Sequence, residues 1–169
     1  DGPMKQVGTG TQKVQQELNQ LFPDMEVARM DADTVSAVNT HEKILERFQK
    51  ENIPILVGTQ MVAKGLNLPD VTLVGVLDAD LSLYGDSYRA GETTFNMLTQ
   101  VVGRAGRGDT PGSALVQTLV PEHPVIQLAA KQDYDGFAKI ELEDRKEFFY
   151  PPFAQMLKLT IWDKSDGEG

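Results

Sequence analysis

The chain contains no cysteine, which rules out disulfide bonds and thiolate metal sites. Its two histidines, His41 and His123, stand far apart and lack the spacing typical of zinc or iron ligands. No apolar run approaches the roughly 18 residues that span a membrane, and no charged-then-apolar leader opens the chain. We therefore expect a cytoplasmic protein with no metal site of its own and no membrane partner.

Positive charge is also scarce. The sequence has 16 Lys and Arg residues but 25 Asp and Glu residues, which gives a net charge of −9. Most nucleic-acid affinity comes from neutralising phosphates, so this balance argues against a protein that binds DNA tightly by itself. Residues 53–107 differ from the rest, since their five acidic and four basic side chains give a net charge of only −1. A local phosphate site is therefore compatible with the acidic chain.

Strand-like and helix-like patterns alternate along the 169 residues. The expected strands are 5–7, 26–30, 53–57, 71–77 and 114–118, and the expected helices are 11–22, 40–50, 93–107, 125–131 and 134–149. This alternation predicts an α/β fold with a mostly parallel sheet and right-handed crossovers. The third and fourth strands are short apolar runs of the kind that is buried on both faces of such a sheet.

The last twenty residues have a different pattern. Tyr-Pro-Pro-Phe at 150–153 ends the charged helix and predicts a rigid hinge. Residues 156–161 then have the pattern of a strand whose partners are absent. We therefore expect one α/β domain over 1–149, and a hinge with the beginning of a further domain over 150–169.

The loop that follows the third expected strand offers groups for a nucleotide or a nucleic-acid backbone. Gly58 and Gly65 allow close approach of the backbone, Thr59 and Lys64 are suited to phosphate oxygens, and Asn67 is suited to a sugar hydroxyl. Ligands of open α/β sheets lie beyond the carboxyl ends of the strands, which is where this loop begins. An ordinary strand–turn–helix connection explains these residues equally well.

The second candidate segment is Gln-Val-Val-Gly-Arg-Ala-Gly-Arg at 100–107. If it ends a helix, Gln100, Arg104 and Arg107 share one face at i, i+4 and i+7. Two guanidinium groups on one face match the charge of a γ-phosphoryl group in transfer. Basic residues also favour a helix C-terminus, which Gly108 would cap. We prefer the functional interpretation, because capping does not call for two glycines, Gly103 among them, in the last turns.

Three other groups of polar residues have simpler explanations. The turn at 8–11 opens a helix whose N–H groups are suited to an anion, although a plain helix cap explains it as well. Asp78 and Asp80 follow a strand, where carboxylates stabilise turns and helix ends more often than they bind metals. Arg89 and Glu92 are spaced for an ion pair within a helix, or for contacts that orient the neighbouring loops.

Taken together, residues 57–69 and 100–107 resemble motifs V and VI of superfamily two helicases. The match becomes more specific with the segments at 70–80, 88–92, 123–127 and 150–153. Over about residues 8–162 the chain is similar to the primosomal replication-restart DNA helicases. This resemblance implies a RecA-like second motor lobe, with a mostly parallel sheet flanked by helices. It further implies a parent enzyme that hydrolyses ATP and moves 3′ to 5′ on DNA at stalled replication forks.

The resemblance also implies roles for individual residues. The side chains expected at the γ-phosphate are Arg104 and Arg107, with Arg107 as the arginine finger. The other residues expected at ATP are Gly65, Asn67, Gln100 and Gly103. The residues expected at the DNA backbone are Thr59, Gln60, Lys64, Gly10 and Thr11, with Gln12 in place of an acidic residue of the family's turn.

The chain departs from that family in two ways. The family's cysteine-rich zinc module is absent, and neither G-x-x-x-x-G-K-[ST] nor D-E-x-H occurs in the sequence. We therefore expect ATP and Mg²⁺ to bind the parent protein, no cofactor to bind this chain, and the chain alone to be inactive. The implied partners are forked or single-stranded DNA, the first helicase lobe, single-strand-binding protein and primosome components.

Two alternatives remain open. The first is a lobe of another superfamily two translocase, such as an RNA helicase, against which the segments 70–80 and 150–153 count. The second is a non-catalytic α/β module that binds a nucleotide or a protein. A face of Gln100, Arg104 and Arg107 packed inside the fold, with no open cleft beside it, would favour this second alternative.

Overall fold

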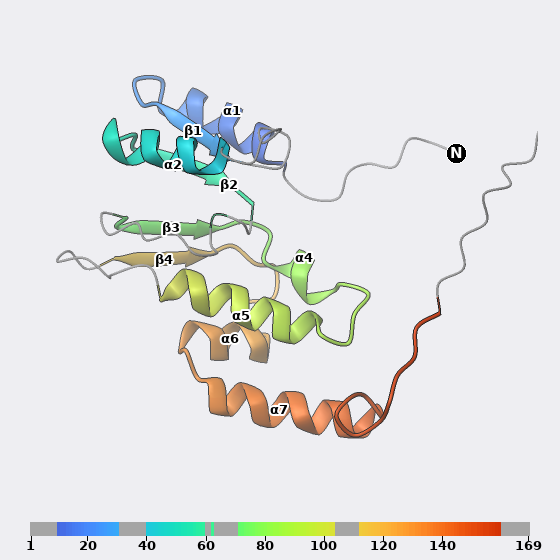
Figure 1. The fold of residues 1–169 in the computed structure, drawn as a ribbon. Coiled ribbons are helices and arrows are strands. Elements are labelled where there is room, and N and C mark those ends of the chain that lie inside the picture. The colour runs from blue at the N-terminus through green and yellow to red at the C-terminus, as the bar shows by residue number, and fades with distance from the viewer. Residues whose placement is uncertain (1–9, 31–39, 60–61, 63–70, 104–111, 160–169) are drawn as a thin grey trace, which may run out of the picture.

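The computed structural model describes residues 10–30, 40–59, 62, 71–103 and 112–159 (Figure 1). The elements of the first half are α1 (Thr11–Leu21), β1 (Val27–Met30), α2 (Thr40–Lys50) and β2 (Ile55–Gly58). Those of the second half are β3 (Leu73–Val76), α4 (Asp80–Leu83), α5 (Ala90–Val102), β4 (Ser113–Val116), α6 (Pro124–Ala130) and α7 (Tyr134–Glu147). The α/β fold expected from the alternating pattern is confirmed.

The first half is built on the parallel pair of β1 and β2. Val27 lies opposite Ile55 and Met30 lies opposite Gly58, so the two strands pair along their whole length. Helices α1 and α2 both contact β1. The first helix ends before Pro23, and the N–H of Phe22 caps it by donating to the carbonyl oxygen of Leu18 at 2.8 Å.

The second half is built on the parallel pair of β3 and β4, with Leu73 opposite Ser113 and Val76 opposite Val116. Helix α5 lies along one face of this pair, and α6 and α7 follow beyond it (Figure 1). The hydrophobic core between these layers consists of Ala79, Phe95, Leu98, Val125, Ile126, Ala129 and Phe137. The rings of Phe95 and Phe137 stack at a centroid distance of 4.1 Å and thereby join α5 to α7.

The strand expected at 71–77 is present but is not buried on both faces. Residues of β3 alternate between exposed and half-buried, and Leu73 is 64% exposed. On the neighbouring strand β4, Leu115 is 67% exposed. The inward residues Val76 and Val116 pack against the core, so the part of the chain that the structure describes covers this sheet on one face only. The expectation of two buried faces is therefore wrong for this strand.

Two other expectations differ from the structure. The helix expected at 93–107 begins earlier, at Ala90, and ends at Val102, because Gly103 has a low helix propensity and closes the last turn by donating its N–H to Thr99. The strand expected at 156–161 is wrong over 156–159, which form no strand. A strand needs a hydrogen-bonded neighbour, and none of the described segments pairs with this one. The strand expected at 5–7 lies outside the described residues.

The described helices include none that is long and apolar enough to cross a membrane. The longest of them, α7, has 14 residues and a mixed charged sequence.

Candidate nucleotide and DNA site

The first candidate segment begins where β2 ends. A Cβ atom on Gly58 would lie 2.6 Å from the carbonyl oxygen of Met30 and would collide with the side chain of Val62. Only glycine fits there, so the close backbone approach expected at Gly58 is present. The N–H of Val62 donates to the carbonyl oxygen of Thr59 at 3.0 Å, which turns the chain directly after the strand. Thr59 lies at the carboxyl end of β2 and is exposed.

The second candidate segment begins on the last turn of α5. Gln100 is exposed, and Gly103 follows the helix as its C-cap. A Cβ atom on Gly103 would lie 3.2 Å from Nε2 of Gln132 and 3.1 Å from the carbonyl oxygen of Thr99. Glycine therefore lets the turn after α6 approach the end of α5 closely.

An open hollow of about 430 Å³ lies beside Gln100. Its lining residues are Phe95, Asn96, Thr99, Gln100, Gly103, Gln132 and Tyr134. These described side chains offer amide, hydroxyl and aromatic groups but carry no charge themselves. Gln100 thus faces open space and not the core, which counts against the non-catalytic alternative.

The remaining candidate residues divide into two groups. Gly10 and Thr11 open α1, where the carbonyl oxygen of Gly10 accepts hydrogen bonds from the N–H groups of Lys13 and Val14 at 3.0 and 3.1 Å. The candidates that lie outside the described residues are Gln60, Lys64, Gly65, Asn67, Arg104 and Arg107. The shared face of Gln100 with the two arginines therefore stays a prediction.

Asp80 has a structural role. Its carboxylate accepts a hydrogen bond from the hydroxyl of Thr118 at 2.5 Å and one from the N–H of Leu119 at 2.8 Å. These two hydrogen bonds stabilise the charged form and hold the pKa of Asp80 below its ordinary value. The carboxylate ties the first residue of α4 to the loop after β4. The structural interpretation favoured from the sequence is confirmed for Asp80, which stabilises the start of α4 and the loop after β4.

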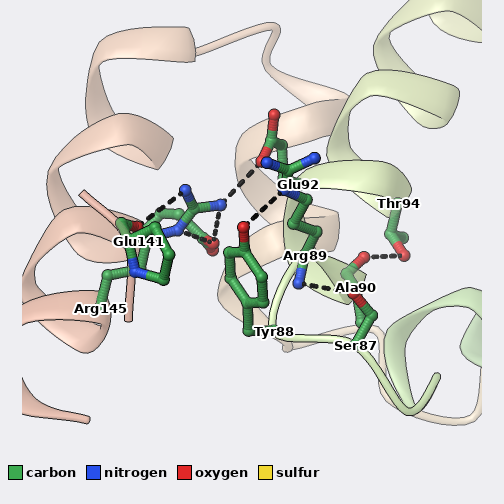
Figure 2. A network of polar contacts seen from close by, with 9 residues as sticks. Ser87, Tyr88, Arg89, Ala90, Glu92, Thr94, Glu141 and Arg145 are labelled. Atoms are coloured by element: carbon green, nitrogen blue, oxygen red, sulfur yellow. Dashed lines mark hydrogen bonds and ion pairs between the residues drawn. The ribbon is translucent and has the colours of Figure 1, made fainter. Parts of the chain in front are cut away.

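Glu92 pairs with a residue far away in sequence. Its Oε2 accepts from the guanidinium of Arg145 on α7 at 2.7 Å. Arg89 has a different partner, because its Nε donates to the hydroxyl of Tyr88 at 3.0 Å (Figure 2). Of the two arrangements expected for Arg89 and Glu92, the pair within the helix is therefore wrong. Local spacing gave no signal for Arg145, which lies 53 residues along the chain.

Comparison with known proteins decides the family. The family model described as the helicase conserved C-terminal domain matches residues 6–109, which is more than half of the chain. The chain belongs to this helicase C-terminal domain family. The match includes both candidate segments, and the α/β architecture of the structure agrees with it.

Relatives of this helicase domain are replication restart proteins. The chain is 48% identical over 154 residues to replication restart protein PriA of Bacillus subtilis, an alignment that covers 91% of this chain and 19% of the relative. It is 46% identical to PriA of a Synechocystis species, over 98% of this chain and 20% of the relative. For PriA of Thermotoga maritima the identity is 35%, over 95% of the chain and 22% of the relative.

The expected resemblance to the replication-restart helicases is therefore confirmed, and it extends beyond the helicase domain match into α6 and α7. The chain spans about a fifth of the length of these relatives.

Proposed function

We propose that this chain is the second motor lobe of an ATP-dependent DNA helicase that moves 3′ to 5′ and acts in replication restart. The similarity to PriA proteins over 91–98% of the chain supports this proposal. The first lobe of the longer protein would supply the phosphate-binding loop and the Mg²⁺ ligands. In such a protein the lobe comprises residues 1–149, and residues 150–169 form a hinge and the start of the next domain.

The nucleotide contacts follow from the second candidate segment. ATP would lie between the two lobes, with Arg107 and Arg104 at the γ-phosphate. Their positive charge would stabilise the negative charge that develops as the γ-phosphoryl group leaves. Gln100, which is exposed on the last turn of α5, and Gly103 directly after the helix would contact the same nucleotide beside the hollow. Two further contacts, from Gly65 and Asn67, belong to this proposal.

The DNA contacts follow from the first candidate segment. Thr59 is exposed at the end of β2, and with Gln60 and Lys64 it would bind the phosphate backbone. The opening of α1 at Gly10 and Thr11 would add N–H groups for another phosphate. The net charge of −9 means that the rest of the longer protein must supply most of the DNA affinity. In the cell, the partners would be DNA, single-strand-binding protein and primosome components in the cytoplasm.

The observation that carries the proposal is the exposed Gln100 on the last turn of α5, three residues before the glycine that precedes Arg104. Gln100, the first residue of the motif Gln-Val-Val-Gly-Arg-Ala-Gly-Arg, is therefore directed away from the core. A partner lobe with bound nucleotide can reach it there.

The test is DNA-stimulated ATP hydrolysis by the full-length helicase, wild type against Arg107→Ala. We expect a loss of at least about a hundredfold in rate with ATP and DNA still bound, since an arginine finger contributes about 10³–10⁵. Arg47→Ala, which removes an exposed arginine of α2, is the matched control and should retain the wild-type rate. A rate for Arg107→Ala within about threefold of wild type would remove the arginine-finger role.

A further inference from the structure

Arg145, near the end of α7, joins three segments of the lobe. Its guanidinium binds Glu92 at the start of α5 at 2.7 Å and Glu141 one turn earlier on α7 at 2.9 Å. A third nitrogen, Nη1, donates to the carbonyl oxygen of Pro151 at 3.4 Å. The side chain of Arg145 is only 15% exposed, so its guanidinium is largely shielded from water, whereas Glu92 stays partly exposed. Figure 2 shows the guanidinium between the carboxylates of Glu92 and Glu141.

The same guanidinium also contacts the ring of Tyr88, which stacks on a second aromatic ring. Its carbon atom lies 5.3 Å from the centroid of the Tyr88 ring, within the range of a cation–π contact. The ring of Tyr88 in turn stacks on that of Tyr150, with centroids 5.3 Å apart and planes 20° apart. The N–H of Tyr150 donates to the backbone carbonyl oxygen of Arg145 at 2.7 Å. Tyr150, three residues after the end of α7, is thus held by both the backbone and the neighbours of Arg145.

The contacts require arginine in particular. A planar guanidinium can serve two carboxylates, a carbonyl oxygen and a ring face at once, whereas the ammonium of lysine is a single point of charge. Burial opposes the charge of Arg145, but the hydrogen bonds that its guanidinium donates to Glu92 and Glu141 outweigh it, and the pKa of Arg145 is raised. The group stays charged at every pH at which the protein is folded.

We propose that Arg145 is a positioning residue that fixes the direction in which the chain leaves this lobe at Tyr150, relative to α5. The contacts of Arg145 with Glu92 and Tyr88 hold the start of α5. Its contacts with Pro151 and Tyr150 hold the segment that follows α7. Helix α5 has 13 residues and is about 20 Å long, and Gln100 and Gly103 lie at its other end. This step rests on the proposed function. If α5 moves when the nucleotide binds, the contacts of Arg145 move the segment after Phe153 with it.

The first test needs no helicase activity. Hydrogen exchange is measured on the full-length protein for the N–H groups of Tyr150 and Phe153, which donate to the carbonyl oxygens of Arg145 and Tyr150. In Arg145→Met we expect exchange at both to be at least about tenfold faster, with the amides in the middle of α7 unchanged. Arg145→Lys should give an intermediate rate and covers the case in which the methionine variant does not fold. Lys146→Met is the matched control, because Lys146 is exposed on the same turn.

Unchanged exchange at Tyr150 and Phe153 in folded Arg145 variants would overturn the proposal. So would an equal acceleration in Lys146→Met, because removal of any positive charge from this turn would then suffice. This measurement decides the role of Arg145 even if the full-length protein hydrolyses no ATP, an outcome that would contradict only the proposed function.

The second test separates positioning from simple stability. We expect Arg145→Met to hydrolyse ATP on DNA within about threefold of wild type but to unwind at least about fivefold fewer base pairs per ATP. A residue that only stabilises the fold would lower both rates in parallel with the folded fraction. Unwinding per ATP equal to that of wild type would overturn the coupling through Arg145.

Discussion

The two halves of the lobe share one pattern of parallel strands and helices but are stabilised in different ways. In the first half, α1 buries no residue, and Arg47 of α2 makes its two ion pairs at the surface, where it is 54% exposed. In the second half, α5 is held by a continuous core around Leu98, and its Glu92 pairs with Arg145, whose side chain is only 15% exposed. Local stability follows buried apolar contacts, so α1 should open more easily than α5. The proposed arginine finger, Arg107, follows α5 in the sequence and so belongs to the half that we expect to open less easily.

The largest effect in this comparison is expected from a substitution that creates a cavity in the core of the second half. Leu98 is 1% exposed, and Leu98→Ala should lower the free energy of unfolding of the chain by about 2–5 kcal/mol. The matched control is Leu21→Ala at the end of α1, where leucine is 71% exposed and the expected change is below about 0.5 kcal/mol. Urea denaturation measures both. Equal losses would show that the two halves do not differ in packing.

A smaller effect is expected at Gly58, where β2 approaches β1 closely in the first half. Gly58→Ala would place a Cβ atom against the backbone of β1, and we expect a loss of about 1–3 kcal/mol from the forced shift. Gly75→Ala provides the matched change in β3, because a Cβ atom there meets no atom within 4 Å. That variant should be neutral or slightly stabilising. A neutral Gly58→Ala would contradict the close approach of the two strands.

A third effect appears only in acid. The pKa of Asp80 is lower in the folded chain than in the unfolded chain, so its contribution to stability is complete above the unfolded value of about 4. That contribution is lost as the pH falls through the lower, folded pKa. Thermal unfolding of Asp80→Asn should therefore depend less on pH below about 4 than that of wild type. Asp24→Asn, in the turn after α1, controls for the loss of one negative charge, and an equal response would contradict the role of Asp80.

The smallest effect should come from the surface ion pairs of the first half. Arg47 binds Glu26 at 2.6 Å and Glu51 at 2.8 Å, and all three side chains are about half exposed. Exposed pairs contribute about 0–1 kcal/mol each, so Arg47→Ala should change the unfolding free energy by little more than that. The change should shrink further in high salt. A loss as large as that of Leu98→Ala would reverse the comparison between the halves.

The sequence was a good guide to the elements because their patterns are local. The expected helices at 11–22, 40–50 and 125–131 agree with α1, α2 and α6 to within one residue at each end. The expected end of the helix at 107 was wrong because a pattern of polar residues does not show where Gly103 closes the turn. The strand expected at 156–161 was wrong because strand propensity cannot supply a partner.

Relations between distant residues could not be predicted. Residues 71–77 are apolar at nearly every position, so the pattern did not show that one face of β3 lies open. Glu92 has an arginine three residues before it, and only the folded chain shows that Arg145 is its partner. The motif that begins at Gln100 is recognisable from the sequence. The exposure of the Gln100 side chain beside a hollow depends on where α6 and α7 pack.

The open face of β3 and β4 also governs how the chain behaves in concentrated solution. Leu73 and Leu115 present adjoining apolar surface there, and such surface favours association between copies. The net charge of −9 opposes it, because copies of like charge repel one another over about a Debye length. Salt shortens that length without altering the leucines. Solubility of the chain should therefore fall as ionic strength rises, and a charged residue in place of Leu115 should restore it.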